Sequence, residues 1–138
     1  MTNLQSRALD PLAQSAIRLG SEQAKEWGEL EEITLKFDEL TKQKLKRLSS
    51  SMSLSIRTVI ESAINYTYTY ITEQKIAIDD LRSQGLAQGD FPLKIVLGLE
   101  TITKLERIGM SEAISECAVI GINLLYDRLI PQDIVSHD

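Results

Sequence analysis

The side chains that most often carry catalysis are sparse in this chain. His137 is the only histidine. A serine or cysteine nucleophile would need a nearby base, and the sequence places none beside a candidate nucleophile. Cys117 is the only cysteine. It lies in an apolar segment without a cationic neighbour, which is typical of a packed and inert thiol.

Acidic pairs and glycines do not indicate a metal or cofactor site. Glu31-Glu32 and Asp79-Asp80 are adjacent pairs, and neighbouring residues do not face each other on a helix. The sequence has no glycine-rich phosphate loop and no His/Cys cluster with metal-ligand spacing. We therefore expect no catalytic residue, no cofactor and no metal, and a protein that is not an enzyme.

Length and composition are typical of one helical, intracellular domain. The chain has 138 residues, of which 43% are hydrophobic and only 5% aromatic. A single cysteine excludes an intrachain disulfide, and the cytoplasm is the expected location. The N-terminal residues do not resemble a signal peptide, and no apolar run approaches the roughly 20 residues of a membrane span.

Charge is distributed unevenly along the chain. The formal net charge is -5, which argues against a protein that coats nucleic acid by neutralising phosphates. Residues 33–60 nevertheless carry six basic and two acidic side chains, a local charge of +4. The basic ones are Lys36, Lys42, Lys44, Lys46, Arg47 and Arg57. This segment is either the solvated face of a helix or an anion-binding surface.

The pattern changes sharply at residue 33. Before it, Asp10-Pro11 opens an N-terminal helical arm (residues 1–31) whose helical spacing could continue as far as Leu30. Residues 33–37 then alternate with a period of two, which predicts a short strand. Asp38 is a good N-cap, and the leucines that follow it have helical spacing up to the serines at 49–51.

Two more helical regions follow. A helix begins at Ser55 and is expected to continue through residues 66–71, although Tyr66 to Ile71 taken alone would also fit a strand. The clearest linker is 84–90. Residues 91–131 are predicted to form a C-terminal helical hairpin, with one helix from about Leu93 to Ile108 and a second, largely apolar one ending near Ile130.

A lone five-residue strand cannot satisfy its backbone hydrogen bonds, and the sequence has no second clear strand. The simplest solution is self-pairing of two chains into an antiparallel ribbon. Such a dimer would bury a core on one side of the ribbon. The expected dimer core is Ile33, Leu35, Phe37, Val59 and Ile60.

Residues about 32–71 resemble the ribbon-helix-helix (MetJ/Arc/CopG) family of DNA-binding proteins. The resemblance is carried by Ile33-Thr34-Leu35-Lys36-Phe37, Asp38-Glu39-Leu40, Leu45-Lys46-Arg47-Leu48 and Leu54 to Ile64. It implies a mainly α fold in which one short strand pairs across a dimer, with residues 32–84 serving dimerisation and DNA binding. The N-terminal helix and the C-terminal hairpin would be additions to that fold.

The resemblance also implies which residues would contact DNA. Thr34 and Lys36 would point outward from the ribbon and read base edges in the major groove. Ser55 and Ile56, at the start of the second helix, would hold a backbone phosphate. Arg57 and the cluster from Lys42 to Arg47 could add phosphate contacts.

Two functions remain open at this point. The first is a homodimeric, sequence-specific transcription regulator, for example a repressor, that binds double-stranded DNA. Residues 92–130 would then join dimers into higher oligomers or receive a protein or small-molecule signal. The alternative is an all-helical interaction or assembly protein with no nucleic-acid binding, in which residues 33–37 are an extended linker and the acidic surface meets a protein partner.

Overall fold

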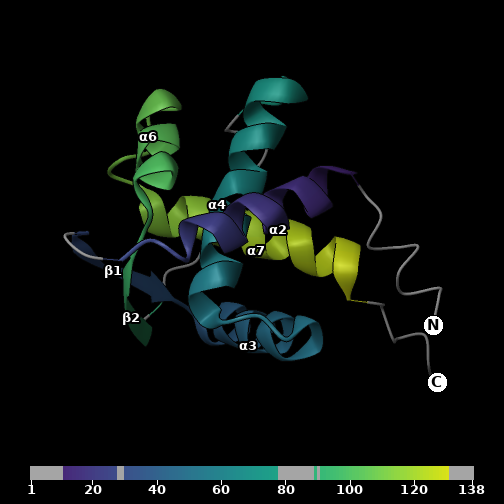
Figure 1. Cartoon of the computed structure of the whole chain (residues 1–138). Helices are drawn as coiled ribbons and strands as arrows, with labels where there is room; N and C mark the ends of the chain where they lie inside the picture. The colour runs from purple at the N-terminus through teal and green to yellow at the C-terminus, as the bar shows by residue number, and fades with distance from the viewer. Residues whose placement is uncertain (1–10, 28–29, 78–88, 90, 131–138) are drawn as a thin grey trace.

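The computed structural model describes residues 11–27, 30–77, 89 and 91–130. In these residues the fold is mainly helical, with one two-stranded antiparallel sheet (Figure 1). The elements in chain order are α2 (Pro11–Gln23), β1 (Glu32–Phe37), α3 (Glu39–Met52), α4 (Ile56–Glu73), β2 (Phe91–Val96), α6 (Leu99–Arg107) and α7 (Ile114–Leu129).

The same order of elements occurs twice. A strand followed by two helices appears as β1-α3-α4 and again as β2-α6-α7. The two strands pair with each other, and the second helices of the two units, α4 and α7, pack together. The chain therefore contains two β-α-α units that share one sheet and one core, with α2 added in front of the first.

Local capping explains where α3 and α4 begin. Asp38 has an extended backbone, and its carboxylate accepts a hydrogen bond from the Thr41 amide at 2.8 Å. Hydrogen bonds from the Thr41 side chain and from the Thr41 amide hold the pKa of Asp38 below its ordinary value. Ser53 ends α3 in the left-handed conformation, with φ 55°. Ser55 then caps α4, because its hydroxyl accepts from the Thr58 amide at 3.0 Å.

Helix α4 is the centre of the core, and α2 and α7 both cross it (Figure 1). The α4–α7 crossing is close because Gly121 lies against the backbone of Ala63, so a Cβ there would collide with the Ala63 carbonyl. Gly20 of α2 lies similarly against Ser62 on α4. These small residues let three helix backbones approach one another, which places apolar side chains of α4 and α7 at complete burial.

The prediction that β1 pairs with a second chain is wrong. Its partner is β2 of the same chain, in an antiparallel register that joins Ile33 to Ile95 and Leu35 to Leu93. One edge of β1 therefore finds its backbone hydrogen-bond partners within the same molecule. The alternative in which residues 33–37 are an extended linker is wrong for the same reason. The all-helical fold expected in that alternative is wrong too.

The predicted C-terminal hairpin is also corrected. Residues 91–96, assigned to its first helix, form β2, and the helix that follows extends only over Leu99–Arg107. Because β1 offers an unpaired edge, extended backbone at 91–96 gains ladder hydrogen bonds that a longer helix would forfeit. The second predicted helix is confirmed as α7.

Other predictions have mixed outcomes. Helix rather than strand is confirmed for Tyr66 to Ile71, which lie inside α4, and the start of the N-terminal helix is confirmed at Pro11. Its continuation towards Leu30 is wrong, because α2 ends at Gln23. The cap at Asp10, the pair Asp79-Asp80, His137 and nearly all of the predicted linker lie outside the described residues.

None of the helices in the described part of the chain is both long enough and apolar enough to span a bilayer.

Candidate nucleic-acid interface

The outer face of the two-stranded sheet is exposed and polar. On β1 the side chains of Glu32, Thr34 and Lys36 are exposed, whereas Leu35 and Phe37 are 1% and 2% exposed. This alternation follows directly from the period of two in the sequence. On β2 the outer positions opposite them are held by Val96, Lys94 and Pro92. We call these two strands and their outer face the ribbon.

The register of the ribbon places equivalent positions of the two β-α-α units opposite each other, as an approximate two-fold relation between the units requires. Thr34 pairs with Lys94, and each of them lies four residues before the N-cap of the following helix, Asp38 or Gly98. When two equivalent residues pair with each other, a two-fold relation between the units passes between them. The crossing of Ala63 and Gly121 is equally symmetric, because each residue is eight positions after its N-cap, Ser55 or Ala113.

One edge of the ribbon is flanked by the start of α4. A mostly apolar pocket of about 180 Å³ lies here, and two lysines of α3, Lys42 and Lys46, stand among its lining residues, so we call it the basic pocket. Its apolar lining residues are Phe37, Leu45, Ile56, Phe91, Pro92 and Leu93. Lys42 also lies over the Phe91 ring, with its ammonium 4.0 Å from the ring centroid. The start of α4 and two cationic side chains thus border one edge of the ribbon.

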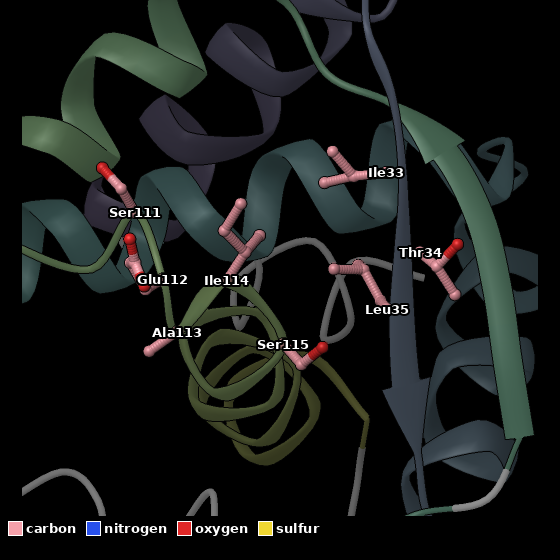
Figure 2. A pocket seen from close by; sticks show the side chains of 8 residues that line it. All are labelled: Ile33, Thr34, Leu35, Ser111, Glu112, Ala113, Ile114 and Ser115. Carbon is pink, nitrogen blue, oxygen red and sulfur yellow. The ribbon is translucent and has the colours of Figure 1, made fainter.

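The other edge is flanked by the start of α7. Ser111, Glu112 and Ser115 line a pocket of about 230 Å³ against residues 33–35, and we call it the serine pocket (Figure 2). The Lys36 amide donates to the Ser115 hydroxyl at 3.1 Å, so this edge of β1 is held to α7. Figure 2 shows Ile33 and Leu35 directed towards α7 and Thr34 on the opposite side of the strand.

The basic side chains of α3 divide into two groups. Lys42 and Lys46 line the basic pocket. Lys44 instead donates to the Asn123 side chain at 2.6 Å, and Arg47 donates to the Tyr126 hydroxyl at 3.2 Å. The second group attaches α3 to α7, which means that only part of the basic segment predicted from the sequence borders the ribbon.

Arg57 does not lie on the surface that the sequence predicts for it. The residue is 9% exposed, and its Nε is 3.1 Å from the Glu61 carboxylate. Its two terminal nitrogens donate to the carbonyl oxygens of Gln23 and Glu26, each at 2.7 Å. Arg57 therefore binds the C-terminal end of α2, where a cation also complements the helix dipole.

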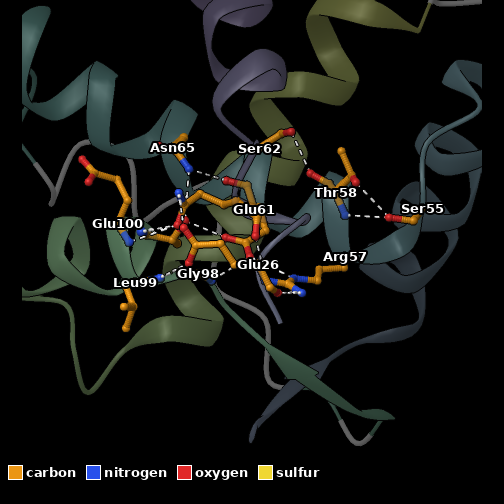
Figure 3. A network of polar contacts seen from close by, with 12 residues as sticks. Glu26, Ser55, Arg57, Thr58, Glu61, Ser62, Asn65, Gly98, Leu99 and Glu100 are labelled. Carbon is orange, nitrogen blue, oxygen red and sulfur yellow. Dashed lines mark hydrogen bonds and ion pairs between the residues drawn. The ribbon is translucent and has the colours of Figure 1, made fainter. Parts of the chain in front are cut away.

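Glu61 is the centre of this buried network (Figure 3). The residue is 0% exposed and also accepts hydrogen bonds from the Gly98 amide at 2.8 Å and the Thr101 hydroxyl at 2.5 Å. Burial raises the pKa of Glu61, and these bonds and Arg57 act against that rise. The Gln23 side chain accepts from the Thr101 amide at 3.2 Å. The network therefore supplies the cap that Gly98 lacks and fixes α6 to α2 and α4.

The residues predicted for a dimer core lie in the core of a single chain. Leu35, Phe37, Val59 and Ile60 are all buried, and Ile33 is partly buried against them. Their apolar partners come from α4, α7 and β2 of the same molecule. Thr34, Lys36 and Ser55 are exposed, and Ile56 is partly buried, so these four predicted site residues lie on or beside the ribbon.

Sequence reasoning missed the second half of the site. The sequence predicts a helical hairpin for the segment that holds Lys94, opposite Thr34, and Ser115, beside Lys36, and indicates no functional role for either residue. One local signal could have identified β2, because Leu93, Ile95 and Leu97 precede Gly98 at the same three positions that Ile33, Leu35 and Phe37 hold before Asp38. Comparisons of the chain with protein-family models, with curated proteins and with solved structures found no match.

The described residues offer no alternative site of metal chemistry, since none of their His, Cys, Asp and Glu side chains form a group of three or more that could hold an ion. Cys117 is fully buried, and burial raises the pKa of its thiol to about 12. The thiol is therefore protonated at neutral pH and a poor nucleophile.

Proposed function

We propose that this protein is a sequence-specific DNA-binding regulator that inserts the ribbon into the major groove of double-stranded DNA. The observation that carries the proposal is the ribbon itself, a two-stranded antiparallel element with Thr34, Lys36 and Lys94 on its exposed face. Two β-α-α units with a shared ribbon support a ribbon-helix-helix arrangement, which we infer to be contained in one chain. A cytoplasmic repressor is the form of regulator we favour.

The dimensions and chemistry of the ribbon support this function. The major groove of B-DNA is wide enough for a two-stranded ribbon. Lys36 and Lys94 each offer an ammonium group that can donate to the O6 and N7 of guanine, and the Thr34 hydroxyl can donate or accept. Hydrophobic residues on the inner face hold the ribbon against the helices, so its outer side chains are presented on a rigid support.

Both pockets beside the ribbon contain groups that can contact the phosphates bordering a groove, and Glu112 in the serine pocket opposes an anion there. The first turns of α4 and α7 begin there, and helix N-termini favour anions. Lys42 and Lys46 add positive charge at the α4 side. Because the whole chain has a net charge of -5, binding is expected to depend on this local surface and to weaken steeply as the salt concentration rises.

A polarisation titration of the protein against its own upstream DNA and against an unrelated duplex, at several salt concentrations, tests the proposal. The wild type should prefer one sequence. The triple change Thr34→Ala, Lys36→Ala, Lys94→Ala should remove that preference, since each good base contact contributes about 1 to 3 kcal/mol of discrimination. The double change Lys42→Ala, Lys46→Ala should weaken binding to both duplexes alike and reduce the salt dependence.

Arg107→Ala is the matched control. Arg107 is an exposed cation in the last turn of α6, and it lines neither pocket. Its loss should leave both affinity and sequence preference within about twofold of the wild type. The proposal fails if the triple variant retains the sequence preference of the wild type, or if Arg107→Ala has the same effect as the triple variant.

A further inference from the structure

We propose that one chain binds one DNA site that lacks two-fold symmetry, and that this site is anchored mainly at the end of the ribbon where Lys36 lies. The inference rests on the proposed function and defines the class of DNA that the ribbon would recognise. When two identical chains form a ribbon, the two-fold axis of the protein requires a palindromic site. Here both strands belong to one chain, so that requirement is absent.

The chemistry of the ribbon differs at positions that the approximate two-fold relation makes equivalent. Lys36 corresponds to Val96, because each lies two residues before an N-cap. The ends of the ribbon are therefore unlike: Lys36 pairs with Pro92 at one end, and Glu32 pairs with Val96 at the other. Lysine favours guanine, a carboxylate accepts from cytosine N4, and an apolar side chain contacts the thymine methyl group. The two half-sites should accordingly differ in base sequence.

The helices that flank the ribbon also differ in charge between its two sides. Lys42 and Lys46 of α3 lie four and eight residues after Asp38 and line the basic pocket. The corresponding positions after Gly98 in α6 are Ile102 and Glu106. The serine pocket contains Glu112 and no lysine or arginine. Phosphates at the α4 side thus meet two cations, and those at the α7 side meet hydroxyls and a carboxylate.

Selection of bound duplexes from a random pool, followed by light scattering on the isolated complex, tests this inference. We expect a non-palindromic consensus and one chain per duplex. Lys36→Ala should relax base preference at one end of the consensus only, with a loss of about 10-fold in affinity for the preferred base. Val96→Ala, the matched variant, should relax the opposite end.

A palindromic consensus bound by two chains would overturn the inference while leaving DNA binding intact. Relaxation of both ends by Lys36→Ala alone would overturn it in the same way. A wild-type protein that selects no sequence from the pool would refute the proposed function, and the inference with it.

Discussion

Replacing Glu61 by leucine should destabilise the fold strongly, although this residue touches no part of the ribbon's outer face. The Glu61 carboxylate is completely buried and accepts hydrogen bonds from Arg57, Gly98 and Thr101. Leucine has a similar volume, so the change removes charge and acceptors without opening a large cavity. The change leaves the guanidinium of Arg57, which is only 9% exposed, without its carboxylate partner.

The magnitude follows from the remaining partners of Arg57. Removing one member of a buried ion pair typically costs about 3 to 5 kcal/mol, because the other charge stays buried. Arg57 keeps two carbonyl acceptors, those of Gln23 and Glu26. We therefore expect the lower end, about 3 kcal/mol, which is a large part of the stability of a domain of this size.

Urea unfolding followed by circular dichroism measures this loss. Glu73→Leu is the control, because Glu73 is an exposed residue at the end of the same helix and its change should stay within about 0.5 kcal/mol. In the double variant Arg57→Met, Glu61→Leu the buried charge is gone. The double variant should therefore lose less free energy of unfolding than the sum of the two single-variant losses, by about 1 to 3 kcal/mol. A Glu61→Leu loss below about 1 kcal/mol, or strictly additive losses, would refute this account of the network.

Three further predictions concern the core, a turn and a cap. Gly121→Val should lower the free energy of unfolding by about 3 kcal/mol or more, because its side chain would collide with the Ala63 backbone; an unchanged thermal midpoint would contradict the close crossing of α4 and α7. Ser53→Gly should raise the free energy of unfolding by about 1 kcal/mol, since glycine adopts the φ of 55° without strain. A lower free energy of unfolding in chemical denaturation would contradict this. Asp38→Ala should cost about 1 kcal/mol at neutral pH. The pKa of Asp38 is lowered in the folded protein, so the stabilisation from its carboxylate is present above the ordinary value of 3.8 and declines as the pH falls below that value. If Asp38→Ala lowered the free energy of unfolding equally at neutral pH and near pH 3, the result would argue against the cap.

The first β-α-α unit was predictable because its signals are local. The alternation at 33–37, the cap at Asp38 and the helical spacing after Ser55 all lie within a few residues of the elements they define. These are the places where intrinsic preference and tertiary structure agree. Thr34 and Lys36 were assigned to an exposed face from this period alone, and the structure has them exposed.

The second unit was not predictable by the same means. Leu93, Val96 and Leu97 fit helical spacing, and Leu93, Ile95 and Leu97 fit the spacing of a strand, so the period does not decide between the two structures. The N-cap of α6 is Gly98, which has no side chain, and its capping groups come from Gln23 and Glu61. A cap supplied from distant sequence leaves no local start signal.

The position of Arg57 depends on contacts that the sequence does not reveal. Its carbonyl partners lie 31 and 34 residues earlier in the chain. From the sequence, a basic residue in the first turn of a helix within a basic segment fits a phosphate contact. Only the packing of α2 against α4 turns the guanidinium inward.

A disulfide across the ribbon tests most directly whether one chain supplies both strands. Lys36 donates its amide to Ser115, and Pro92 opposite it has no amide hydrogen. That pair is therefore not hydrogen-bonded across the ribbon, and neither is Thr34–Lys94, two residues along. Such pairs have Cα atoms about 4.5 Å apart, within the range that a disulfide spans.

In the double variant Thr34→Cys, Lys94→Cys, the buried Cys117 should remain unreacted because burial raises its pKa to about 12. Mild oxidation followed by mass spectrometry under non-reducing conditions is the measurement. Our account predicts an intrachain bond between residues 34 and 94 in a protein with the mass of one chain. Covalent dimers joined at these positions, or free thiols at both, would contradict it.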